Sequence, residues 1–183
     1  YKVSDFLEVE DLSLDELRIV FEDSESVKKS RAMKSKGALD PVLSLNNRVV
    51  ALLFAKPSTR TRFSFEVGIN QMGGKAISVS ENDMQLSNGE KVSDTAQVLS
   101  QYVDLMVLRT NRHGDLLELA KNSEIPVING LTNHSHPCQV LTDLLTYYEE
   151  NGSIEGKKVC WSGDFNNVCY SYAAVSYTHL TLP

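Results

Sequence analysis

The sequence has few cysteines and no long apolar run, and both absences narrow what the protein can be. Its three cysteines, Cys138, Cys160 and Cys169, are scattered, so they indicate reduced thiols and no zinc site. No apolar stretch approaches the roughly 20 residues that a membrane-spanning helix needs. Basic residues are outnumbered, 18 against 24 acidic, and the net charge of −6 argues against nucleic acid or an anionic membrane as the main partner. With no recognisable signal peptide, we expect a cytoplasmic protein.

The remaining composition is that of a globular protein. Hydrophobic residues make up 42% of the 183 positions and charged residues 23%. This length is enough for one ordinary domain, or for one domain and part of a second.

Apolar runs alternate with segments of helical periodicity along the chain. Strands are predicted at Val49–Phe54, Lys75–Val79, Leu105–Leu108, Ile125–Ile128 and Lys158–Trp161. Helices are predicted from a capping box at Ser13 to about Ala32, from Ser58 to Met72, from a cap at Ser93, around Leu116–Ala120, and over Pro137–Asn151. This alternation predicts an α/β fold with a parallel sheet flanked by helices on both faces.

A basic turn, Lys56–Arg62, joins the first predicted strand to the next helix, with Ser58 as the expected N-cap. Helix starts normally favour acidic residues, because their free N–H groups carry partial positive charge. Here Arg60 and Arg62 occupy the first turn, which indicates a site for a small anion such as phosphate. The alternative is that both arginines pair with surface carboxylates.

Two further segments fall on the same edge of the predicted sheet. Arg109 ends the third strand, and His136 precedes the helix that Pro137 opens. Ligands of such sheets bind at the carboxyl ends of the strands, so these side chains are expected near the basic turn. The alternative for His136 is a capping role, with Gln139 at the third helical position.

These motifs resemble the aspartate/ornithine carbamoyltransferase family over about residues 4 to 172. The resemblance rests on Ser58-Thr59-Arg60-Thr61-Arg62, Arg109-Thr110 and His136-Pro137-Cys138-Gln139. Two other segments are most similar to the ornithine-specific members: Asp83-Met84-Gln85-Leu86 with Gly89-Glu90, and Gly163-Asp164-Phe165-Asn166-Asn167-Val168. Phe165 departs from the glycine that is usual there, which affects the expected turn geometry.

The resemblance implies transfer of the carbamoyl group of carbamoyl phosphate to the δ-amine of L-ornithine, giving citrulline and phosphate in arginine biosynthesis or related metabolism. It assigns carbamoyl-phosphate binding to Ser58, Thr59, Arg60, Thr61, Gln85, Arg109, His136 and Gln139, and ornithine binding to Asn167. Arg60, Arg109 and His136 would also act in catalysis. Donors aimed at a developing oxyanion are typically worth about 3 to 4 kcal/mol of barrier each. No metal or organic cofactor is required. Cys138 is expected to pack, and His113 and His134 to be solvated loop residues.

The family also implies a homotrimer in which Gln85 reaches a neighbouring subunit's site; a flexible surface loop is the alternative. A structural turn role is the alternative for Asn166 and Asn167. Residues 1–150 are expected to form the carbamoyl-phosphate domain, and residues 151–174 to begin a truncated ornithine-binding domain with the strand at Lys158–Trp161. Residues 175–183 show no helical period and look foreign to the family. The chain alone is therefore expected to be inactive. Carbamoyl transfer to aspartate or to acylated ornithine, and a non-catalytic anion-binding fragment, stay open.

Overall fold

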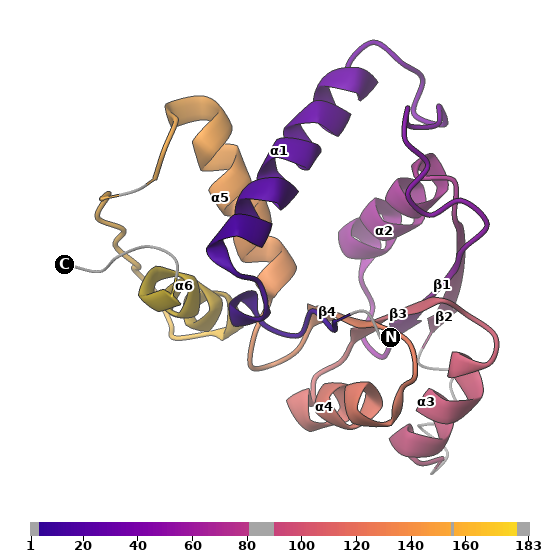
Figure 1. Ribbon diagram of the computed structural model, residues 1–183. Coiled ribbons are helices and arrows are strands. Elements are labelled where there is room, and N and C mark those ends of the chain that lie inside the picture. The colour runs from indigo at the N-terminus through magenta and orange to yellow at the C-terminus, as the bar shows by residue number, and fades with distance from the viewer. Residues whose placement is uncertain (1–3, 81–89, 155, 179–183) are drawn as a thin grey trace.

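A computed structural model describes residues 4–80, 90–154 and 156–178 of the chain. A four-stranded parallel sheet forms its centre, in the order β2-β1-β3-β4 (Figure 1). The strands are β1 (Val49–Phe54), β2 (Lys75–Ser80), β3 (Leu105–Arg109) and β4 (Val127–Leu131). The predicted α/β class with a parallel sheet is confirmed.

Alternate residues of β1 point to opposite faces of the sheet, and each face is covered. Ala51 and Leu53 pack in a cluster with α3 (Val92–Ser100) and α4 (His113–Asn122). Val50, Leu52 and Phe54 pack on the other face against Ile69 of α2 (Thr59–Gln71). Burial on both faces explains why this strand is a continuous apolar run.

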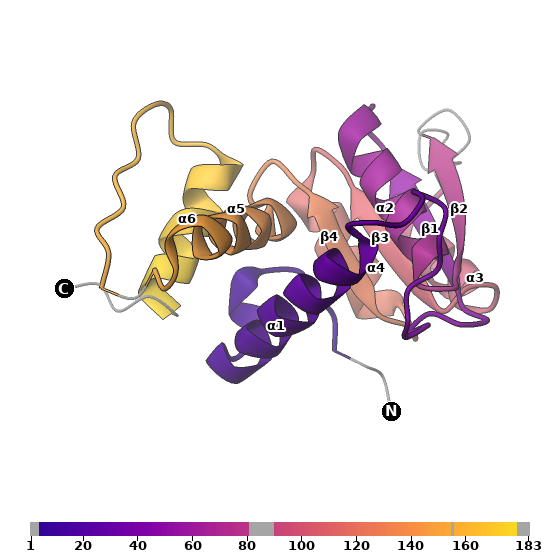
Figure 2. The ribbon, with the colours of Figure 1, turned by 90° about the horizontal axis from the view of Figure 1, so that it is seen from above.

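A third group of helices lies beside β4, at the edge opposite β2 (Figures 1 and 2). It comprises η1 (Val9–Asp11), α1 (Leu14–Arg31), α5 (Pro137–Asn151) and α6 (Asn167–Thr178). Their shared core contains Val9, Val140, Leu144 and Val175, all buried. No helix within the described ranges is both long and apolar enough to cross a membrane.

Several predicted helix ends are found in the structure. The capping box at Ser13 is present, since its hydroxyl accepts from the Glu16 N–H and the Glu16 carboxylate accepts from the Ser13 N–H. Gly73 follows α2 with a φ of +83°, a left-handed conformation that favours glycine. The prediction that Ser93 caps α3 is wrong. Lys91 is the N-cap residue of this helix, and the Ser93 hydroxyl donates to the Asp94 carboxylate.

Three other expectations need correction. β4 begins at Val127 and not at Ile125, since Pro126 has no N–H to donate and pairing starts after it. Residues 158–161 form no strand and are exposed; no neighbouring strand pairs with them in the described part of the chain. Helix α6 continues to Thr178 with Val175 buried, so the absence of helix expected from residue 175 is wrong up to residue 178. Residues 179–183 lie outside the described residues.

Candidate functional site

The candidate site begins where the strand order of the sheet reverses. β1 has β2 on one side and β3 on the other, and the residue pair Phe54 and Arg109 marks the shared carboxyl end of β1 and β3. Open parallel sheets bind ligands at such a reversal. The basic turn follows β1 at this place, so the topology itself positions it as a binding loop.

Helix α2 starts at this turn without a cap. Ser58 is the N-cap residue, as predicted, but its side chain makes no capping hydrogen bond. The first turn contains no acidic residue either. The N–H groups of this turn therefore lack the side-chain acceptor that usually satisfies them, and an anion can take its place.

The two arginines of the turn have different surroundings. Arg62 donates from Nε to Glu66 Oε1 at 2.8 Å, one helical turn later. Arg62 therefore pairs with a surface carboxylate, which was the alternative to anion binding. Arg60 is exposed and has no carboxylate partner among the described residues. The guanidinium of Arg60 is thus available to a ligand, while that of Arg62 is neutralised.

A cavity of about 540 Å³ opens over this turn. It is lined by Pro57, Ser58, Thr59, Arg60, Thr61, Arg109, Leu131, His136 and Gln139. These residues come from the turn after β1 and the start of α2, from the ends of β3 and β4, and from the start of α5. The described side chains that sequence reasoning assigned to carbamoyl phosphate are thus all brought together around one space.

Arg109 projects into this cavity from the end of β3. One of its terminal nitrogens, Nη1, lies 3.4 Å from Thr61 Oγ1. Its Nε is buried and has no hydrogen-bond partner among the described residues. Burial lowers the pKa of Arg109 from its ordinary value. A partly desolvated cation with an unused donor is a strong position from which to bind an oxygen of a ligand.

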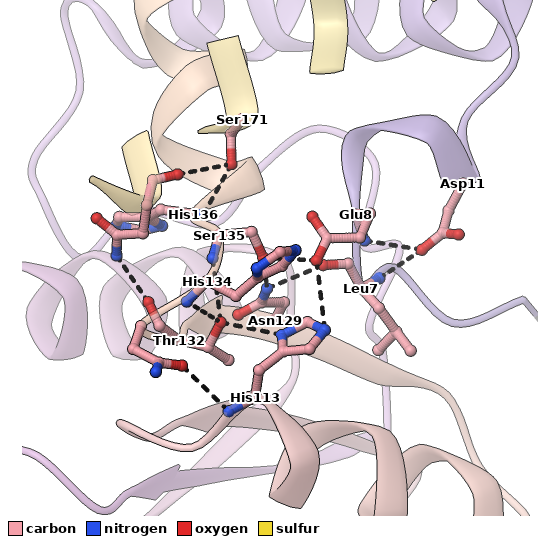
Figure 3. Close-up of polar contacts among 12 residues, drawn as sticks. Leu7, Glu8, Asp11, His113, Asn129, Thr132, His134, Ser135, His136 and Ser171 are labelled. Atoms are coloured by element: carbon pink, nitrogen blue, oxygen red, sulfur yellow. Dashed lines mark hydrogen bonds and ion pairs between the residues drawn. The ribbon is translucent and has the colours of Figure 1, made fainter. Parts of the chain in front are cut away.

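His136 faces the cavity from the N-cap position of α5. Its backbone N–H donates to Ser171 Oγ at 2.9 Å, which holds the residue from α6 (Figure 3). The ring is mostly buried, and Nδ1 has no partner among the described residues. Burial, followed by the nearby charge of Arg109, lowers the pKa of His136 to about 4. The imidazole is therefore neutral near pH 7 and offers one N–H donor and one acceptor.

Gln139 lies one helical turn further along α5, at the rim of the cavity. Its amide nitrogen donates to Asp143 Oδ1 at 2.8 Å. This contact turns the amide so that its oxygen is the group left to accept a hydrogen bond. Cys138 between them is half-buried, and desolvation raises the pKa of its thiol to about 12, which agrees with a packing role.

The residue expected to bind the second substrate, Asn167, does not line this cavity. It donates from its side chain to the Thr132 carbonyl at 2.7 Å. Asn166 Oδ1 accepts from the N–H groups of Val168 and Cys169 at 3.0 Å, so it caps α6. This pattern agrees with the turn role kept open for the pair. Gln85 lies outside the described residues.

Sequence reasoning missed two features of the site. Leu131 lines the cavity with a φ of +154°, beside an irregular register between β3 and β4. Such backbone strain is frequent at binding sites, and no sequence pattern signals it for leucine. Ser171 is buried and lies 35 positions from His136, so no local motif connects them.

Comparisons with known proteins agree with this geometry. The family model for "Aspartate/ornithine carbamoyltransferase, carbamoyl-P binding domain" matches residues 4–149. Ornithine carbamoyltransferase of Paracoccus denitrificans is 50% identical over 169 residues, covering 92% of this chain and 55% of that protein. The chain thus spans about half the length of the curated relatives it matches.

Solved structures give the same result. Ornithine carbamoyltransferase from Burkholderia thailandensis has a TM-score of 0.87 at 43% identity, covering 96% of this chain and 59% of that one. Aspartate transcarbamoylase from Trypanosoma cruzi, in complex with N-(phosphonacetyl)-L-aspartic acid, has a TM-score of 0.75 at 26% identity, covering 85% and 47%. The similarity is greater to the ornithine enzyme than to the aspartate enzyme in both measures.

Proposed function

Because the chain belongs to the aspartate/ornithine carbamoyltransferase family, we propose that its cavity binds carbamoyl phosphate for transfer of the carbamoyl group to L-ornithine. The observation that carries this proposal is the meeting, around one cavity, of an uncapped helix start, of Arg60 without a carboxylate partner among the described residues, and of the buried nitrogen atoms of Arg109 and His136. Inorganic phosphate would need only the helix start and Arg60. The buried donors match a carbonyl oxygen beside the phosphate.

Each group has a role in the proposed reaction. The N–H groups at the start of α2, with Ser58, Thr59, Thr61 and Arg60, bind the phosphate oxygens. Arg109 and His136 donate to the carbonyl oxygen, and Gln139 accepts from the carbamoyl NH₂. The neutral δ-amine attacks the carbonyl carbon, the bond from that carbon to the phosphate oxygen breaks, and the proton that the amine loses passes to the departing phosphate. Donors already in place for the oxyanion lower the barrier.

The whole protein is proposed to release citrulline in arginine metabolism, in the cytoplasm and as a homotrimer. The names of the relatives support ornithine over other amines. This chain spans only part of their length, so we do not expect turnover from it alone. Carbamoyl transfer to aspartate, as by the Trypanosoma cruzi relative, is the second candidate. Product formation by the full-length protein with ornithine, acylated ornithine and aspartate in turn distinguishes them.

Calorimetry with carbamoyl phosphate tests the binding site directly. We expect Arg60→Ala to weaken binding at least about tenfold, because a charge-assisted hydrogen bond contributes about 1.5 to 3 kcal/mol. Arg62→Ala is the matched control, since Glu66 already pairs with that guanidinium, and it should change affinity little. Equal affinity of wild type and Arg60→Ala for carbamoyl phosphate would contradict the proposed anion site. Binding of inorganic phosphate as tight as that of carbamoyl phosphate would favour a simple anion-binding fragment.

A further inference from the structure

Outside the cavity, three potential metal ligands meet from segments far apart in the chain. Glu8 precedes η1, His113 is the first residue of α4, and His134 lies between β4 and α5. One ligand atom of each lies within 4.8 Å of the others, and His113 Nε2 is 3.7 Å from Glu8 Oε1 (Figure 3). His113 is therefore not a solvated loop residue, as the sequence had suggested, while His134 is exposed.

Two of these side chains are oriented by further contacts. His113 Nδ1 lies 3.1 Å from Thr132 Oγ1, which fixes the ring so that Nε2 faces Glu8. Glu8 Oε1 accepts from the Ser135 hydroxyl at 2.6 Å. For His113 this is the usual arrangement at metal sites, in which the ring nitrogen that does not bind the ion has an outer partner.

The contacts within the cluster leave binding capacity unused. The separation of 3.7 Å between His113 and Glu8 is too long for a hydrogen bond. Glu8 Oε2 is buried and has no partner among the described residues. The His134 ring lies 4.7 Å from that of His113 and 4.0 Å from that of Tyr170, measured between ring centroids, and both contacts are tilted, so the ring packs beside the other ligands.

We propose that Glu8, His113 and His134 form a binding site for a divalent transition-metal ion of the zinc class. Two imidazole nitrogens and one carboxylate oxygen are a donor set that Zn²⁺ uses, with a fourth position open to water. Mg²⁺ and Ca²⁺ prefer oxygen ligands throughout. With metal–ligand distances of about 2.0 to 2.2 Å, the ligand atoms of a tetrahedral site lie roughly 3.3 to 3.6 Å apart. The 3.7 Å between His113 and Glu8 is close to this, and the His134 ligand atom, within 4.8 Å of the other two, has to move inward. Binding selects the His113 tautomer in which Nδ1–H donates to Thr132.

The ion would have a structural effect, separate from carbamoyl transfer. It would join the N-terminal segment, α4 and the loop that leads to His136. A ligand that binds only the folded state raises stability according to its concentration relative to its Kd. Zn²⁺ should therefore raise the melting temperature of the chain, and the rise should require His134.

The test is calorimetry with Zn²⁺ on chelator-treated chain, together with Co²⁺ absorption spectroscopy. We expect one Zn²⁺ per chain and at least about tenfold weaker binding in His134→Asn and in Glu8→Gln. His134 is exposed, so its substitution leaves the core intact. The competing ligand is the exposed thiol of Cys160, and Cys160→Ser is the control. Bound Co²⁺ should give the visible absorption bands of an ion with a low coordination number, without a thiolate charge-transfer band.

Two results would overturn the proposal. A Zn²⁺ affinity of His134→Asn equal to that of wild type would show that the cluster is only a packed and hydrogen-bonded network. Loss of binding in Cys160→Ser, or a thiolate band with Co²⁺, would assign the ion to cysteine. Neither result bears on carbamoyl-phosphate binding, which is measured with a different ligand and different variants.

Discussion

Arg109 Nε and His136 Nδ1 are buried polar atoms without a partner among the described residues, and both belong to side chains that line the cavity. Leaving such an atom unsatisfied costs about 1 to 3 kcal/mol. A folded chain retains that cost where a ligand later satisfies the group. Sequence motifs could identify these residues as candidates, but only their surroundings in the fold show that each has an unused hydrogen-bonding atom.

Arg109→Met tests this cost at a single residue. Methionine replaces a half-buried guanidinium, with its buried and unsatisfied Nε, by an apolar chain of similar length, so we expect unfolding free energy in urea to rise by about 1 kcal/mol. Carbamoyl phosphate should stabilise wild type and no longer stabilise the variant. Arg18→Met is the control, because Arg18 is exposed and its pairing with Asp15 lies on the surface. A marked loss of stability in Arg109→Met would mean that the unsatisfied guanidinium carries no such cost. Stabilisation of the variant by carbamoyl phosphate would mean that Arg109 does not bind this ligand.

At the scale of elements, prediction succeeded where a segment's own residues determine its structure. β1 was predicted with its observed bounds, because all but its first residue are buried and the run is apolar throughout. β4 extends beyond prediction over Asn129, whose side chain donates to the Leu7 carbonyl and to Ser135 Oγ. Those partners lie elsewhere in the chain, so the burial of a polar residue in a strand could not be anticipated.

The unformed strand at residues 158–161 shows the complementary case. Its apolar character predicted a strand, but a strand requires a neighbour to accept and donate backbone hydrogen bonds. Trp161 instead donates from its ring to the Asp164 carbonyl at 3.1 Å, a contact within the same loop. The local sequence gives these residues a propensity for strand structure, but a strand forms only where a neighbouring segment pairs with it.

An ion pair at the end of α1 stabilises the connection between α1 and β1. Arg31 donates from Nε to Asp40 Oδ1 at 2.7 Å and from Nη2 to Oδ2, and the Asp40 side chain is only 1% exposed. The Asp40 N–H also donates to the Gln71 carbonyl at 2.8 Å, which links the connection to the end of α2. Hydrogen bonding from Arg31 lowers the pKa of Asp40.

Asp40→Asn should therefore reduce unfolding free energy by about 2 kcal/mol near pH 7. Since the native carboxyl has the lower pKa, the unfolded chain binds more protons in the ordinary Asp range, and stability increases with pH there. The contribution is complete above about pH 4 and disappears as pH falls through the native value. In urea unfolding, the difference in unfolding free energy between wild type and Asp40→Asn should shrink as the pH falls across this range. A constant difference would contradict this, and Glu25→Gln, in an exposed pair, should have little effect at any pH.

At the scale of the whole molecule, the cavity lies where the sheet meets the helices from both ends of the described chain. The N-terminal segment pairs with β4, since the Phe6 N–H donates to the Val127 carbonyl at 2.8 Å. From the other end, Ser171 of α6 holds the backbone of His136. The grouping of the described anion-site residues could be predicted, because parallel strands share a carboxyl edge. The support from α6 could not, since it depends on long-range packing.

Val175 offers a test of whether α6 belongs to this packed unit. Its residue range was expected to be foreign, yet its side chain is fully buried with Val9, Val140 and Leu144. Val175→Ala removes two buried methyl groups, so we expect unfolding free energy in urea to fall by about 2 kcal/mol. Val159→Ala is the matched control, because Val159 is 54% exposed, and its effect should stay within about 0.5 kcal/mol. Equal effects of the two substitutions would mean that α6 does not pack against η1 and α5, and that His136 lacks its support from Ser171.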